Sequence, residues 1–154
     1  MPVSATSRKI MLTDDFRYEE PLASAAIYPG MIGQLDSDGK VLPNNGAGLA
    51  CLMLIPIEDS LVGDLISTVY AIGDMVRYVL PRKGERCLLR LADGETAVKG
   101  SKLVSNGDGT VKVMSADSSA AVIEETLLAI ADEAVDMSDS SGADPVAFIK
   151  SIIV

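Results

Sequence analysis

The chain has 154 residues, of which 48% are hydrophobic and 23% are charged, ordinary proportions for a single globular domain. Its 22 acidic and 13 basic residues leave a net charge of −9, which argues against binding to nucleic acid or to an anionic membrane surface. The sequence has no histidine, which excludes Ser-His-Asp and Cys-His catalytic arrangements and removes the commonest zinc ligand.

No apolar run approaches the ~20 residues that a helix needs to cross a bilayer. The two cysteines, Cys51 and Cys87, lie in the apolar stretches LACLML and ERCLLRL. Such surroundings favour small buried side chains in a reducing compartment over a disulfide. We therefore expect no catalytic residue, no bound metal and no cofactor.

Residues 1–20 differ in pattern from the rest and are predicted to form an extended arm. Within it, Ile10, Leu12, Phe16 and Tyr18 share one face of an extended chain. One interpretation is a first strand of the domain's own sheet. The other is an arm whose four apolar residues pair with an exposed strand of another protein.

After Pro21 the pattern changes to short strands broken by turns, spaced about ten residues apart. Strands are expected at residues 31–35, 41–42, 49–57, 71–80, 86–91, 96–104 and 110–114. This spacing predicts that residues 21–154 form one mainly β domain, a compact barrel-like or sandwich body with little helix.

The stretch LACLMLIPI, residues 49–57, is apolar on both faces of a strand. Such a strand is either central in a sheet or covered by another subunit. The residues of this candidate subunit-interface strand are Leu49, Cys51, Leu52, Met53, Leu54 and Ile55.

Two Gly-rich stretches could bind an ion or turn the chain. DSDGK, residues 36–40, begins like a calcium loop but continues with Val, Leu and Pro instead of further ligands. SNGDGT, residues 105–110, is followed by a predicted strand, whereas a phosphate loop needs a helix there. Both are therefore predicted to be tight turns.

The segment from 118 to 137 gives conflicting signals. Its Ala, Leu and Glu residues favour a helix over residues 120–133 by local propensity. The β-branched residues of DPVAFIKSIIV, residues 144–154, predict a last strand.

Four motifs occur in a characteristic order: LTDDFRYEEPLASAAIYPGMIGQL, VYAIGDMVRYVLPRKGE, ADGETAVKGSKLVSNGDGTVKV and EAVDMSDSSGADPVAFIKSIIV. This series, which spans residues 12–154, resembles the head decoration (cement) proteins of tailed bacteriophages. The resemblance implies a non-enzymatic β protein that is made in the bacterial host cytoplasm and resides on the outer capsid surface of the virion.

As the resemblance implies further, such a protein forms a homotrimer that bridges subunits of the major capsid protein and stabilises the expanded shell, gripping it with an N-terminal segment. It also favours a strand over residues 127–137. If Ile10, Leu12, Phe16 and Tyr18 anchor the arm to the capsid, deleting residues 1–19 should leave a folded trimer that binds capsids weakly.

Two other classes of function remain open. AVKGSKLV, residues 97–104, has a distant likeness to the turn of biotinyl or lipoyl carrier domains, in which a lysine such as Lys99 would be modified. An enzyme that uses only Asp, Lys and Tyr is the third hypothesis. A trimer in solution favours the decoration protein, and covalent modification of Lys99 favours the carrier or ligand-binding module.

Overall fold

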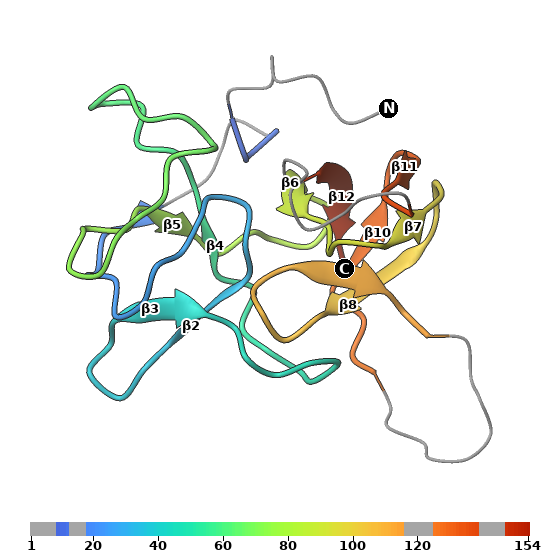
Figure 1. The fold of residues 1–154 in the computed structure, drawn as a ribbon, viewed down its shortest axis with the longest axis horizontal. Coiled ribbons are helices and arrows are strands. Elements are labelled where there is room, and N and C mark those ends of the chain that lie inside the picture. Colours follow the sequence, from blue (N-terminus) through green and yellow to red (C-terminus); the bar gives the residue numbers. More distant parts are fainter. Residues whose placement is uncertain (1–8, 13–17, 116–124, 139–146) are drawn as a thin grey trace.

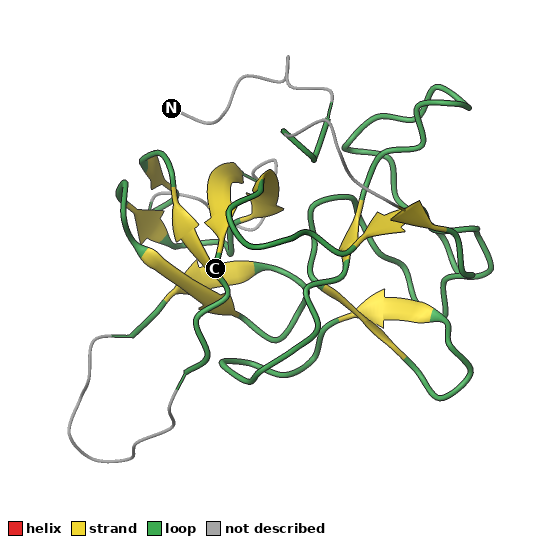
Figure 2. Ribbon diagram, turned by 180° about the vertical axis from the view of Figure 1, so that it is seen from behind, coloured by secondary structure: helices red, strands yellow, loops and turns green. Residues whose placement is uncertain are grey.

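The computed structural model describes residues 9–12, 18–115, 125–138 and 147–154. In these residues the protein contains twelve short strands and no helix, so it is mainly β, as the sequence predicts. Figure 2 shows strands joined by long loops, with the strands gathered into two groups that lie side by side. We call residues 18–80 the first half and residues 81–154 the second half.

The second half contains the largest sheet, five antiparallel strands in the order β6-β12-β10-β8-β9 (Figure 1). Their bounds are β6 Arg86–Arg90, β8 Lys102–Ser105, β9 Val111–Val113, β10 Ala129–Ala131 and β12 Phe148–Ile153. An isolated bridge between Leu91 and Val111 brings the two edges of the sheet near each other without closing a barrel. A two-stranded ribbon of β7 (Thr96–Ala97) and β11 (Val135–Asp136) lies beside it.

The first half has shorter strands. β1 (Tyr18–Glu19), β5 (Tyr78–Val79) and β4 (Ile55–Pro56) form a sheet in the order β1-β5-β4. β2 (Gly33–Leu35) and β3 (Val41–Pro43) form a hairpin. Isolated bridges between the pairs Ala23 and Val41, Leu22 and Met75, and Gly33 and Leu54 connect these pieces. The first half therefore depends on many small pairings, whereas the second half has one continuous sheet.

The sequence locates most strands but overestimates the length of three. The strand expected over residues 96–104 is two strands, β7 and β8, separated by a turn. Of the strand expected over residues 49–57 only β4 forms, and of that expected over residues 71–80 only β5 forms. β5 lies between β1 and β4, and residues 76–79 are all buried, so the chain does not alternate between core and solvent there.

The conflict after residue 118 is resolved in favour of strand where the structure describes it. Residues 125–133 contain no helix, and β10 and β11 lie within the expected strand over 127–137, while residues 120–124 lie outside the described part. β10 pairs with β12 on one side and β8 on the other, and Ala129 and Ala131 are buried. Two ladders of backbone hydrogen bonds and the burial of small side chains outweigh the helix propensity of this segment.

Both Gly-rich stretches are turns. In the first, the Asp36 Oδ1 atom accepts hydrogen bonds from the backbone N–H groups of Asp38 and Lys40, each at 2.9 Å. These bonds, that of Lys40 above all, lower the pKa of Asp36. Gly39 takes a φ of 74°, a left-handed conformation that glycine adopts without strain.

The second turn, residues 106–110, also joins the two halves. A Cβ atom on Gly107 would lie 2.9 Å from the Cβ of Ala47, and one on Gly109 would lie 3.1 Å from the Sδ of Met31. The Ile32 N–H donates to the Gly109 carbonyl at 2.7 Å. The two glycines thus allow the turn to approach the first half closely, as well as allowing it to turn.

The core consists of two clusters. The larger is built on the five-stranded sheet but includes Ile55 and Val79 from the first half, together with Ile10. The smaller lies within the first half, around Ile27 and Leu54. Both cysteines are free, as expected: Cys87 is buried and Cys51 is half-buried.

Candidate interaction surface

Residues 57–77, which we call the β4–β5 connection, form the longest segment between strands that the structure describes in full. An isolated bridge between Tyr70 and Ile27 attaches it to the first half. Loops longer than about 12–15 residues without regular structure are uncommon in compact domains and usually have a function. The connection is therefore the first place to look for one.

The connection exposes an unusual amount of apolar side chain. Leu61 is 78% exposed, Val62 72% and Ile72 74%. Of the fourteen large hydrophobic side chains that are exposed among the described residues, six lie in this connection: Leu61, Val62, Leu65, Val69, Ile72 and Met75. Such a concentration of exposed apolar groups usually marks a surface that contacts another molecule.

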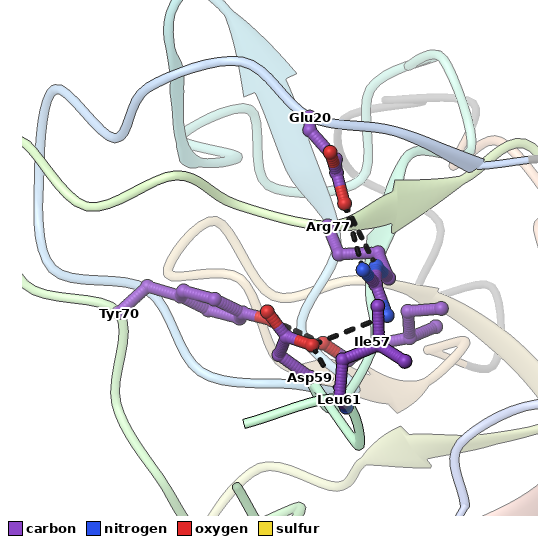
Figure 3. A network of polar contacts seen from close by, with 6 residues as sticks. All are labelled: Glu20, Ile57, Asp59, Leu61, Tyr70 and Arg77. Carbon is purple, nitrogen blue, oxygen red and sulfur yellow. Dashed lines mark hydrogen bonds and ion pairs between the residues drawn. The ribbon is translucent and has the colours of Figure 1, made fainter. Parts of the chain in front are cut away.

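Arg77 fixes the base of the connection (Figure 3). Its Nη2 atom lies 2.8 Å from Glu20 Oε1, and its Nη1 atom lies 3.2 Å from Asp59 Oδ1. The same Asp59 oxygen accepts a hydrogen bond from the Leu61 N–H at 3.1 Å. Because Arg77 is only 7% exposed, these charge-assisted bonds are shielded from water and hold both ends of the connection together.

Two further polar contacts hold the start of the connection. The Tyr70 hydroxyl donates to the Ile57 carbonyl at 2.6 Å, and desolvation raises the pKa of Tyr70 to about 12, so the donor stays protonated at neutral pH (Figure 3). The Glu58 Oε2 atom accepts from the Ile10 N–H at 3.0 Å. The apolar residues that follow therefore extend from a fixed support.

Arg90 attaches the middle of the connection to the second half. Its Nη2 group donates to the Ile66 carbonyl at 2.8 Å, and its Nε group donates to the Pro29 carbonyl at 2.7 Å. The guanidinium carbon lies 4.7 Å from the ring centroid of Tyr28 and 4.8 Å from that of Phe148. Burial lowers the pKa of Arg90 to about 10, which still leaves it charged at neutral pH.

A half-open cavity of about 270 Å³ lies at the base of the connection. Apolar groups of Met11, Ile57 and Leu61 line it together with charged groups of Lys9, Glu58 and Arg77. Glu58 and Arg77 already have partners within the chain, and Lys9 is exposed. The cavity thus offers a hollow next to the exposed Leu61, with one lysine among its lining residues.

The structure separates the four residues predicted to anchor the arm. Ile10 is fully buried in the core, and Leu12 is 38% exposed. Phe16 lies outside the described residues, and the backbone of Tyr18 pairs with Val79 in β1. Met11 forms a bridge with Cys87, which places this segment at the edge of β6. Ile10 is therefore covered by its own chain and not presented to a partner.

The candidate subunit-interface strand is also divided. Leu49 and Leu52 are exposed, and Cys51 and Met53 are half-buried. Leu54 and Ile55 are fully buried within the chain's own core. Of these six residues, Leu49 and Leu52 are the exposed ones that another subunit could cover. They belong to a loop, residues 49–53, and not to a strand that is covered on both faces.

The two thiols are held in protonated form, and Lys99 is already paired. Burial raises the pKa of the Cys87 thiol to about 12 and also raises that of Cys51, which disfavours the nucleophilic thiolate. Lys99 is exposed in the turn between β7 and β8 and lies 3.4 Å from Asp132. No group of three or more acidic or cysteine side chains in the described ranges is arranged to hold a metal ion.

No protein-family model matches the chain, and no curated protein matches it in sequence. In the part that the structure describes, no helix has the length and apolar character needed to cross a membrane. The interaction surface is therefore inferred from geometry alone.

The β4–β5 connection is the feature that sequence reasoning missed. Its apolar residues follow neither the two-residue period of a strand nor the 3.6-residue period of a helix. The available signal was a run from residue 58 to 75 that is rich in apolar residues, contains four acids and no base, and is broken by Gly63 and Gly73.

Proposed function

We propose that the chain is a structural protein that associates with other proteins through exposed apolar side chains, and that it is a head decoration protein of a tailed bacteriophage. In this role it binds the outer surface of the capsid as a trimer, bridges major capsid protein subunits and stabilises the expanded shell. The order of sequence motifs supports the phage assignment. The observation that carries the proposal is the β4–β5 connection, with its fixed base and its exposed apolar side chains.

The arrangement suits binding for a thermodynamic reason. Association is weakened when flexible segments must be ordered, by about 0.5–1.5 kcal/mol for each immobilised side chain. The contacts of Arg77, Tyr70 and Arg90 already order the backbone of the connection in the free protein. Fully burying one Leu, Val or Ile side chain contributes roughly 1.5–3 kcal/mol. A few such side chains are enough for a weak contact, not for a tight one.

Trimer formation would convert weak contacts into firm attachment. Linking binding sites on one rigid assembly can raise avidity by about 10²–10⁴ without any new contact. The net charge of −9 is consistent with a decoration protein. Before assembly it repels other copies of the protein, and it also repels packaged DNA.

The test is co-sedimentation with expanded, empty heads of tailed phages that lack decoration protein. We expect the wild-type protein to sediment with heads of at least one phage and Leu61→Ser/Ile72→Ser to bind at least about tenfold more weakly. The matched control is Leu35→Ser, which changes an exposed apolar residue on the β2–β3 hairpin and should bind like wild type. Absence of binding across a broad panel of heads would contradict the proposal.

A carrier module remains the second candidate because Lys99 is exposed at a tight turn. Intact-mass measurement of the protein purified from bacteria expressing biotin and lipoyl ligases distinguishes the two. The decoration proposal expects the unmodified mass, and a biotinyl or lipoyl adduct on Lys99 would favour the carrier.

A further inference from the structure

Basic residues are distributed unevenly between the two halves of the protein. The first half, residues 18–80, carries eight acidic and two basic residues, a net charge of −6. The second half, residues 81–154, carries twelve acidic and eight basic residues, a net charge of −4. The net charges are therefore similar, but most of the basic side chains lie in the second half.

The first half, with only two basic residues, includes the apolar connection. Asp64 lies between the exposed side chains of Val62 and Leu65, and Asp74 lies between those of Ile72 and Met75. The acids Glu58 and Asp59 are already bonded to the Ile10 N–H and to Arg77. Arg77, held at the base, is the only basic residue of the connection. The exposed surface is therefore apolar with an acidic border.

The second half has a surface of opposite character, which we call the cationic face: Val98, Lys99, Arg86 and Lys150. Arg86 and Lys99 both contact Asp132, at 3.1 and 3.4 Å, and Lys150 contacts Glu133 at 3.8 Å. The cationic side chains are 57%, 76% and 48% exposed, whereas the two acids are 20% and 24% exposed. The acids are recessed and the cations project, with Val98 exposed beside Lys99.

The two surfaces lie on different parts of the molecule. Along the longest axis, which is horizontal in Figure 1, the β4–β5 connection lies at the left end, β6 and β12, which carry Arg86 and Lys150, lie near the middle, and β7, which precedes Lys99, lies towards the right. Two copies that met connection to connection would bring like charges together, which is unfavourable. A head-to-tail contact instead joins apolar to apolar and acidic to basic surface.

We propose that the β4–β5 connection of one copy docks on the cationic face of a second copy. This contact is heterologous, so it generates a ring when the rotation between copies closes and an open filament when it does not. The inference rests on the part of the proposed function in which identical copies associate, and it names the surfaces that touch. The capsid contact of the proposed function uses the same connection, so the contact between copies covers the part around Asp64 and leaves the part around Ile72 for the capsid.

The test is charge exchange, read by light scattering coupled to size-exclusion chromatography over a dilution series. Asp64→Lys and Lys99→Glu should each weaken self-association at least about tenfold, because each places like charges across the contact. The double variant Asp64→Lys/Lys99→Glu should recover most of the lost affinity. Its recovery would also show that the single variants are folded.

The matched control is Asp38→Lys, which makes the same charge change at an exposed position of the β2–β3 turn. It should associate like wild type, and raising the salt concentration should weaken wild-type association more than that of the single variants.

An oligomer that is unaffected by Asp64→Lys and Lys99→Glu, or a double variant that associates no better than either single variant, would overturn the inference and leave capsid binding intact. A wild-type protein that stays monomeric at every concentration would overturn both the inference and the proposed trimer, while co-sedimentation with heads would still decide capsid binding.

Discussion

The two halves of this protein are stabilised by different kinds of backbone pairing. The second half has a five-stranded sheet whose central strands are paired on both sides, and it supplies most of the larger core cluster. The first half has strands of two or three residues joined by isolated bridges around a smaller cluster. Its longest segment, the β4–β5 connection, belongs to no sheet and pairs with residues 21–27 through isolated bridges and single backbone hydrogen bonds.

This difference teaches how an exposed apolar loop can keep a defined shape. Side-chain contacts add to the backbone bonds with residues 21–27: Arg77 and Tyr70 fix the base, and Arg90 reaches from the second half to the middle. The second half thus acts as a scaffold, and the first half presents the surface. The predictions below challenge this division in order of decreasing effect.

Replacing Arg90 should have the largest effect, because its buried side chain links the two halves through two hydrogen bonds and two aromatic contacts. Arg90→Met leaves the Pro29 and Ile66 carbonyls without their donors and loses the contact with two aromatic rings. We expect a loss of about 3–5 kcal/mol in the free energy of unfolding, measured by urea denaturation. A loss below about 1 kcal/mol would mean that the halves do not depend on this link.

Truncating Ile10 should cost nearly as much. Ile10 is fully buried in the larger cluster, so Ile10→Ala should lower the free energy of unfolding by about 2–5 kcal/mol in urea. Leu12→Ala, at a partly exposed neighbour, is the control and should cost much less.

Deleting residues 1–19 removes Ile10 and should therefore destabilise the domain, contrary to the expectation from sequence that a folded trimer would remain. Deleting residues 1–8 alone leaves Ile10 in the chain, and equal losses from both deletions would contradict this placement of Ile10.

Arg77→Met should loosen the connection selectively. It removes the bonds to Glu20 and Asp59, and we expect a loss of about 1–3 kcal/mol together with faster amide hydrogen exchange in residues 57–77. Arg86→Met is the matched control, because Arg86 makes an exposed ion pair that should contribute less than about 1 kcal/mol. Unchanged exchange in the connection would show that Arg77 does not hold it.

The smallest effect concerns the β7–β11 ribbon. Hydrogen bonds from the Ser138 backbone and side chain, then from Thr96, lower the pKa of Asp136 to about 2. A carboxyl group whose pKa is lowered by folding stabilises the protein above its ordinary pKa and ceases to do so as the pH falls from about 4 to 2. At pH 5 Asp136→Asn should lower the urea midpoint slightly, and at pH 2 the two proteins should coincide. A constant difference at both pH values would contradict the assignment.

The sequence predicted what depends on local chemistry. Asp36 and Gly39 specify their turn by hydrogen bonds and φ, and the β-branched residues of β12 specify a strand. Local propensity did not predict what depends on distant partners. It favoured a helix at Ala129 and Ala131, which become strand residues because β8 and β12 lie on either side, as only the family resemblance suggested.

The candidate surface was out of reach for the same reason. Nothing local shows that Arg90 will reach Ile66, 24 residues away, or that Arg77 will bind Glu20, 57 residues away. Without these contacts the segment from 58 to 75 reads as an irregular apolar loop. Ile10 is the opposite case. The alternating pattern of residues 10–18 fits an arm that binds a partner, but Ile10 is buried within its own chain.

Hydrogen–deuterium exchange, compared between the dilute protein and its assembled state alone and on phage heads, tests the role of the connection most directly. We predict that assembly slows amide exchange in residues 57–77, while exchange in the β2–β3 turn at residues 36–40 stays the same. Equal exchange of residues 57–77 in free and assembled protein would contradict the claim that the connection is the surface through which this protein associates.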